Sequence, residues 1–224
     1  ANNVFIGYLT GDANTTGSDN TAVGKSALSA NTTAGSNVAV GSGALSANTT
    51  GAGNVGIGVG AFRVNTTGAE GIAIGDGCLA LNTSGALNTG LGAQSLSKTT
   101  TGANNTAAGG YALQNNTTGA SLTAVGANAL RANTTAANNT AVGSSALAAN
   151  TTGAYNVAVG KSALAANISA SNNTALGYQA LDSNTTGSSN VAVGTNAMGV
   201  NVGGNTSTAV GVDALAANTT GSLN

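Results

Sequence analysis

The sequence predicts an all-β fold, a parallel β-solenoid (β-roll) built of about 13 coils of 17 residues, and two observations carry this prediction. A glycine recurs every 17 residues from Gly7 to Gly211, without an insertion or a deletion. Within each interval apolar and polar residues keep fixed places, as in the segment Asn139–Tyr155. A period held this strictly indicates that each turn of chain stacks on the one before it. We number the repeat 1 to 17 from its Asn, which puts the recurring glycine at repeat position 5.

The period makes residues 1–224 one repetitive domain. Residues 1–17 are the least regular turn, because Phe5 replaces an alanine and Gly11 replaces a leucine. We interpret this segment as an end turn or as the remnant of an upstream junction. A solenoid normally ends in an atypical polar turn, and no such cap is visible before Asn224. We therefore expect the fold to continue beyond Asn224, in covalent sequence or in a stacked partner.

Two short strands per coil are expected. Repeat positions 2–4 alternate like a strand, as in Thr140-Ala141-Val142, and repeat positions 8–10 are predicted to form a second strand. Glycines at these intervals leave no room for a helix of ordinary length. Thirteen coils stacked at about 4.8 Å would make a rod roughly 60 Å long.

The apolar residues at repeat positions 4 and 9 are the predicted core. Replacing one of the leucines there is expected to cost about 2–5 kcal/mol. The residues expected to be buried in register are Val142, Val159, Leu147 and Leu164.

The alternation then places repeat position 3 on the opposite face of the first strand. Solvent-facing columns normally carry charged or long polar side chains, yet this column is almost entirely alanine or glycine. We interpret it as a surface covered by another chain. The predicted self-association residues are Ala141, Ala158, Ala175 and Ala192.

Composition and charge exclude several functional classes. Charged residues are 5% of the chain and the formal net charge is −1, which gives no electrostatic basis for binding nucleic acid or an anionic membrane. No apolar run approaches the roughly 18 residues of a membrane span. All eleven charged residues fall at repeat positions 6, 7, 10, 11 and 17, which are therefore predicted to face solvent. The chain does not begin with Met, which suggests a processed or excised piece of a longer protein.

The strings Asn37–Gly41, Asn156–Gly160 and Asn190–Gly194, each reading NVAVG, resemble the head repeats of bacterial trimeric autotransporter adhesins. The resemblance implies a left-handed parallel β-roll, three chains packed into one trimeric head, and binding to host or matrix surfaces or glycans. This chain departs from that family in its longer, 17-residue coils and in showing no coiled-coil stalk or membrane anchor. Similar repeats also occur in tail fibres and other surface fibres.

Catalysis and cofactor binding have little support in the sequence. There is no His, and the six carboxylates are scattered over different turns without repeated pairing. A calcium-binding β-roll would require an Asp in every turn. We therefore expect no enzymatic activity, no cofactor and no metal site. Cys78 occupies an alanine position and is interpreted as a small buried residue.

The most informative polar feature is the Asn-Thr-Thr segment at repeat positions 12–14. Asn and Thr close turns on their own backbone, and stacked Asn side chains can form a hydrogen-bonded ladder. The same segment is an N-glycosylation acceptor, so an inward ladder and an outward row of glycans both remain open, with the ladder favoured. The residues concerned are Asn14, Asn31, Asn48, Asn65, Asn82, Asn116, Asn133, Asn150, Asn167, Asn184 and Asn218.

We expect the chain to be a structural or adhesive segment of an extracellular or cell-surface fibre, or of a virion fibre, that associates with itself as a trimer or filament. Two alternatives stay open. Regular threonine columns on a nearly uncharged solenoid favour ice binding, although the adjacent threonines at repeat positions 13 and 14 lie in a turn. The other alternative is a densely glycosylated extracellular filament.

Overall fold

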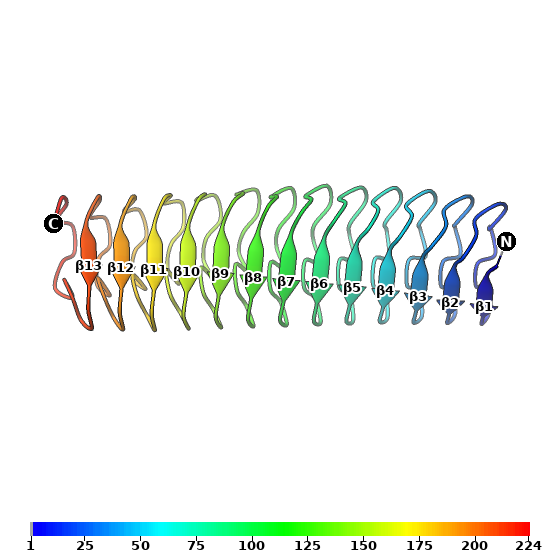
Figure 1. Ribbon diagram of the computed structural model, residues 1–224, viewed down its shortest axis with the longest axis horizontal. Helices are drawn as coiled ribbons and strands as arrows, with labels where there is room; N and C mark the ends of the chain where they lie inside the picture. Colours follow the sequence, from blue (N-terminus) through cyan, green and yellow to red (C-terminus); the bar gives the residue numbers. More distant parts are fainter. Residues whose placement is uncertain (1) are drawn as a thin grey trace.

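The computed structural model describes residues 2–224 and has the shape of a rod of stacked coils (Figure 1). Each coil contributes one three-residue strand, and the strands form a single 13-stranded sheet in sequence order. The two chain ends lie at opposite ends of the rod (Figure 1). The predicted parallel β-solenoid of 17-residue coils is confirmed. The strands are β1 (Val4–Ile6), β2 (Thr21–Val23), β3 (Val38–Val40), β4 (Val55–Ile57), β5 (Ile72–Ile74), β6 (Thr89–Leu91), β7 (Thr106–Ala108), β8 (Thr123–Val125), β9 (Thr140–Val142), β10 (Val157–Val159), β11 (Thr174–Leu176), β12 (Val191–Val193) and β13 (Thr208–Val210).

Every residue of strands β1–β12 pairs with the residue 17 positions later in the chain. Ala141 pairs with Ala158, and Ala158 pairs with Ala175, in parallel register. Each repeat position therefore forms a column along the rod, with a spacing of about 4.8 Å between neighbours. We number the coils by their strands, so that coil 9 contains β9.

The two faces of the sheet are the reverse of the prediction. Ala141, at repeat position 3, is 0% exposed, whereas Val142, at repeat position 4, is 36% exposed. The predicted burial of Val142 and Val159 is wrong, because both lie on the outer face of the sheet and are at most half-buried. The predicted burial of Leu147 and Leu164 is confirmed, with 0% exposure for each.

The narrow interior of the coil explains why alanine rather than valine points inward. A Cβ atom built on Gly56, at repeat position 3, would lie 3.2 Å from Cγ of Leu45, at repeat position 9 of the preceding coil. One methyl group at repeat position 3 therefore already reaches the leucine column. A larger side chain there would overpack the core, which typically costs about 1–3 kcal/mol.

Two coils keep the interior volume by exchanging large and small residues. In coil 1, Phe5 takes the place of the inward alanine, and a Cβ at Gly11 would lie 2.5 Å from the Phe5 ring. In coil 4, Phe62 replaces the leucine and Gly56 replaces the alanine. The Phe62 ring also requires Gly71 in the next coil, where a Cβ would lie 2.6 Å from Phe62 Cζ. A phenylalanine at repeat position 3 or 9 is thus accompanied by glycine at the positions that its ring faces.

The predicted second strand at repeat positions 8–10 is wrong, because these residues form turns. Leu147 has φ 51° and Ser145 has φ 59°, both in the left-handed region. Backbone hydrogen bonds nevertheless join this side of successive coils, as from the Leu147 N–H to the Ala163 carbonyl at 3.0 Å. The left-handed conformation turns the chain at repeat position 7 and again at position 9, which lets the leucine side chain enter the coil.

The recurring glycine at repeat position 5 has a steric explanation. Gly143 has φ 135°, a conformation that residues with a side chain rarely adopt. A Cβ atom there would also lie 2.5 Å from the carbonyl oxygen of Gly160 in the next coil. The glycine ends each strand where no other residue fits, and this requirement fixes the 17-residue period in the sequence.

Candidate functional surfaces

A ladder of asparagine side chains runs through the rod at repeat position 12. Asn150 is fully buried, and its Nδ2 donates to Oδ1 of Asn133 at 3.3 Å and to the carbonyl of Gly153 at 2.9 Å. Its own Oδ1 accepts from Nδ2 of Asn167 at 2.8 Å. The inward ladder that the sequence favoured is confirmed. Its members are Asn14, Asn31, Asn48, Asn65, Asn82, Asn116, Asn133, Asn150, Asn167, Asn184 and Asn218, joined by Asn201.

The ladder is incompatible with glycosylation of these residues in the folded rod. A glycan would be attached to Nδ2, the atom that donates to the preceding ladder residue and to the carbonyl three residues later, as in Asn150. The residues are fully buried except at the two ends, where Asn14 and Asn218 are half-buried. Asn218 keeps both donor bonds, whereas Asn14, in the first coil, donates only to the carbonyl of Gly17. Asn201 lies in an Asn-Val-Gly segment, which is no glycosylation acceptor, and still joins the ladder. The asparagine at this repeat position is therefore explained by the hydrogen bonds inside the rod, without glycosylation.

The ladder has one defect, at Thr99 in coil 6. Thr99 has no amide to donate to the preceding coil, and Oδ1 of Asn82 is consequently buried without a hydrogen-bond partner. On the other side Thr99 only accepts, through a 3.4 Å contact from Nδ2 of Asn116. An unpaired buried acceptor costs about 1–3 kcal/mol.

We therefore predict that Thr99→Asn stabilises the protein, by about 0.5–1.5 kcal/mol, the net contribution of a hydrogen bond. The new amide would donate to Asn82 Oδ1 and extend the ladder without interruption. Chemical denaturation of the two proteins measures the difference. Thr101→Asn, at an exposed position two residues away, serves as the control and should leave the stability unchanged. An unaltered or lowered midpoint for Thr99→Asn would contradict the ladder's energetic role.

A second asparagine column, at repeat position 1, carries a repeated set of hydrogen bonds of its own, from which only Nδ2 of Asn37 is missing among its buried amide atoms. Oδ1 of Asn139 accepts from the backbone N–H of Asn156 at 2.8 Å, and its Nδ2 donates to the carbonyl of Gly153 at 2.7 Å. No role for this asparagine was predicted from the sequence beyond marking the start of the repeat. Its presence in ten of the thirteen coils was the available signal, because a solvent-exposed turn residue would vary more freely.

The threonines at repeat position 13 also join successive coils by hydrogen bonds, although they are only partly buried. The hydroxyl of Thr117 donates to the carbonyl of Thr134 at 2.9 Å, and the same bond repeats along the column. The single proton of each of these hydroxyls is therefore used within the rod. The neighbouring threonines at repeat position 14, such as Thr118, are exposed.

The predicted self-association column is not a surface. Ala141, Ala158, Ala175 and Ala192 are each 0% exposed within a single chain. They pack in the core with the leucines of repeat position 9. The prediction that these alanines contact another chain is wrong. Repeat position 3 was expected on the outer face of the strand, but it lies on the inner one.

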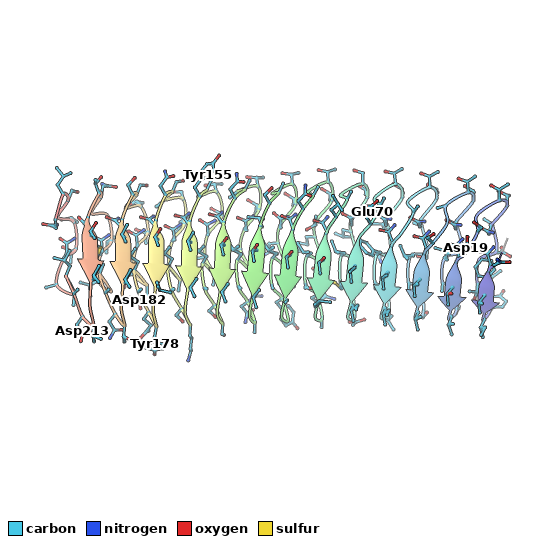
Figure 2. All side chains as sticks on the ribbon, viewed as in Figure 1. Asp19, Glu70, Tyr155, Tyr178, Asp182 and Asp213 are labelled. Carbon is cyan, nitrogen blue, oxygen red and sulfur yellow. The ribbon has the colours of Figure 1, made fainter. Side chains whose placement is uncertain are left out.

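The outer face of the sheet is the surface that the sequence prediction had placed inside. We call it the sheet face, and it consists of the side chains at repeat positions 2 and 4 of all thirteen strands. It is apolar or threonine-bearing throughout and carries no charge. In Figure 2 the labelled Tyr178 and Asp213 project at one edge of the rod and Tyr155 at the other, with the sheet between them. Its most exposed apolar members within strands β3–β12 are Val40, Ile57, Ile72, Ile74, Leu91, Val125, Val142, Val157, Leu176 and Val191.

Cys78 is a buried core residue, as interpreted from the sequence. Its Sγ lies 3.1 Å from Oγ of Ser95, and burial raises the pKa of the thiol to about 11. Since the thiolate is the reactive form, Cys78 is expected to be inert at neutral pH.

Residues 2–224 contain no group of three or more His, Cys, Asp or Glu side chains that could hold a metal ion. Within the same range, no helix is long and apolar enough to cross a membrane. No family model matches the sequence, and neither a curated protein nor a solved structure matches the chain.

Proposed function

We propose that the chain is a structural and adhesive segment of an extracellular fibre, whose copies associate side by side through the sheet face. The observation that carries this proposal is an uncharged, largely apolar face along the whole rod, whose side chains are half-buried or exposed in the single chain. Contiguous apolar patches of this kind mark interaction sites in soluble proteins. The trimeric arrangement implied by the resemblance to adhesin heads is one assembly that such contacts permit.

The dimensions of the sheet face suit a stable contact. Thirteen strands at about 4.8 Å extend for roughly 60 Å, and the two outward columns with their side chains are about 10 Å wide. The projected area is thus about 600 Å², and the accessible area of a corrugated face is larger. Stable interfaces bury about 800 Å² per partner, so the sheet face is of the required order.

A second copy of the chain is the occupant that fits this face best. Both partners present side-chain columns with the same axial spacing, so every coil of one copy meets an equivalent coil of the other. Neither face carries a charge that would be left unpaired at the contact. The charged repeat positions lie outside the face and stay in solvent.

Sedimentation velocity tests this proposal. The unmodified chain is expected to form oligomers at micromolar concentration, and the triple variant Val125→Lys, Val142→Lys, Leu176→Lys is expected to sediment as a monomer, because like charges would meet at the contact. The matched control places the same three charges on the exposed repeat position 14, as Thr118→Lys, Thr135→Lys, Thr152→Lys, and should still assemble. Far-UV circular dichroism confirms that each variant is folded. A monomeric unmodified chain would refute self-association.

Ice binding is the second candidate, and the threonines of the sheet face support it better than the adjacent threonines of the turn. Seven of the thirteen residues at repeat position 2 are threonine, and their side chains lie on the outer face of a regular sheet rather than in a turn. Axial spacings of about 4.8 Å and lateral spacings of about 7 Å lie near repeat distances of the oxygen lattice of ice. Methyl and hydroxyl groups in such an array could hold ordered water.

The same variants separate the two candidates. If the sheet face binds ice, it must stay uncovered by a second copy. The chain should then shape ice crystals and give thermal hysteresis that the sheet-face triple variant abolishes and the position-14 control keeps. Rounded crystals at high protein concentration would remove this candidate.

A further inference from the structure

Two adjoining open grooves run along the turn side of coils 4–10, away from the sheet face. In both grooves residues at repeat position 7 form one wall, joined by Val59 at position 6 in the first groove, and residues at repeat positions 10 and 11 form the other side. The base is formed by small side chains, including Ala80, Ser97, Ala132 and Ala148, which leaves room for a ligand between the larger ones. Gln114 lines the first groove and Arg131 the second. The Nε atom of Arg131 donates to Oε1 of Gln114 at 3.2 Å, so the two grooves meet at this pair.

Three of the five cationic residues of the chain line these grooves. They are Arg63 in coil 4, Lys98 in coil 6 and Arg131 in coil 8, all exposed. One cation therefore occurs at every second coil, at an axial interval of about 10 Å. Among residues 2–224 no Asp or Glu lines either groove. Asp76, at repeat position 6 of coil 5, precedes the lining residue Gly77 in the chain but does not itself line the groove.

Neutral groups in the grooves suit a sugar ligand. Gln94 and Gln114 present amides that donate and accept hydrogen bonds. Tyr111, beside the junction, is 45% exposed. The Arg131 guanidinium lies 5.8 Å from the centre of the Tyr111 ring, a cation–π contact that, with the bond to Gln114, fixes the position of the cation.

We propose that these grooves bind an extended anionic polysaccharide carrying one carboxylate per disaccharide. The inference rests on the adhesive part of the proposed function and does not depend on self-association. An interval of about 10 Å between cations is comparable to the length of one disaccharide, so successive carboxylates would meet successive cations. Duplex DNA carries one charge per about 1.7 Å, a density that three cations at this interval do not match. A small anion would contact only one cation.

Isothermal titration calorimetry with a hyaluronan decasaccharide at low ionic strength tests the proposal. The unmodified chain is expected to bind saturably, and Arg63→Gln, Lys98→Gln to weaken binding at least tenfold. The matched control removes two cations outside the grooves, Lys25→Gln, Lys161→Gln, and should stay within twofold of the unmodified chain. The carboxyl-reduced decasaccharide should not bind. Equal losses in the two double variants, or no saturable binding at millimolar ligand, would overturn the proposal.

A second variant tests the spacing while the net charge stays constant. Leu81 occupies repeat position 11 of coil 5, the position of Lys98 one coil earlier, and is 39% exposed. Leu81→Lys, Lys98→Gln therefore shifts the middle cation by one coil along the same column. Binding is expected to weaken several-fold, and unchanged binding would show that only overall charge matters.

Tighter binding of duplex DNA than of the decasaccharide would assign the grooves to nucleic acid and overturn the proposal. Sedimentation of the same samples reports self-association separately, so failure of one proposal is distinguishable from failure of the other.

Discussion

Replacing Asn150 with Asp is expected to destabilise the rod by about 3–5 kcal/mol at neutral pH, the cost of a buried charge without a partner. A carboxylate could still accept from Asn167 Nδ2, but it could donate to neither Asn133 Oδ1 nor the Gly153 carbonyl, which Asn150 Nδ2 serves. The new carboxylate oxygen would then lie within hydrogen-bond distance of two other acceptors, Asn133 Oδ1 and the Gly153 carbonyl, with no proton between them. Equilibrium denaturation at several pH values measures the effect.

The pH dependence follows from the burial of the new carboxyl group. Desolvation raises the pKa of a buried carboxyl above its unfolded value of about 3.9. The protonated side chain can donate a hydrogen bond, so the variant should be closest to the unmodified protein below that value. Its stability should fall as the pH rises from about 4 toward the raised pKa of the folded state. Asn138→Asp, at an exposed position, is the matched control, and a similar loss in both variants would argue against the ladder.

Replacing Leu147 with Ala is expected to cost about 2–5 kcal/mol, because it removes a fully buried side chain and leaves a cavity. Leu147 is 0% exposed and packs among the inward alanines and neighbouring leucines. In a stacked repeat each coil contacts only its neighbours, so hydrogen exchange should accelerate mainly in coils 8–10. Denaturation and exchange together measure the loss.

Val142→Ala is the control for the leucine substitution. Val142 is the most hydrophobic residue of strand β9, yet it is 36% exposed on the sheet face. Its truncation in a monomeric sample should cost about 1 kcal/mol or less. A larger loss at Val142 than at Leu147 would contradict the assignment of the two faces.

The coil and its strand could be predicted from the sequence because both depend on local, repeated requirements. Gly143 is held by its backbone conformation and by the approach of Gly160, and such a glycine leaves a fixed period. The inward Asn150 column was also predictable, since a charged residue never replaces it. These features need no knowledge of how wide the coil is.

The direction of the strand's side chains could not be taken from hydrophobicity alone. Valine is more apolar than alanine, which suggested that Val142 points inward, but the interior has room for only one methyl group opposite the leucine. The sequence does contain a signal for this, because Phe5 coincides with Gly11 and Phe62 coincides with Gly56. Large residues paired with glycines at repeat positions 3 and 9 indicate that these positions face each other. The turn at repeat positions 8–10 depends on left-handed leucines, a conformation that leucine rarely adopts.

Thiol labelling tests the central claim, that repeat position 3 points into the coil and repeat position 4 points to a face free for association. Cys78 is buried with a raised pKa and supplies an unreactive internal reference. Ala141→Cys is expected to remain as unreactive as Cys78 at neutral pH, whereas Val142→Cys should react at the rate of an accessible thiol in the dilute monomer and become protected as the chains associate. Rapid labelling of Ala141→Cys together with a protected Val142→Cys in the monomer would contradict this account.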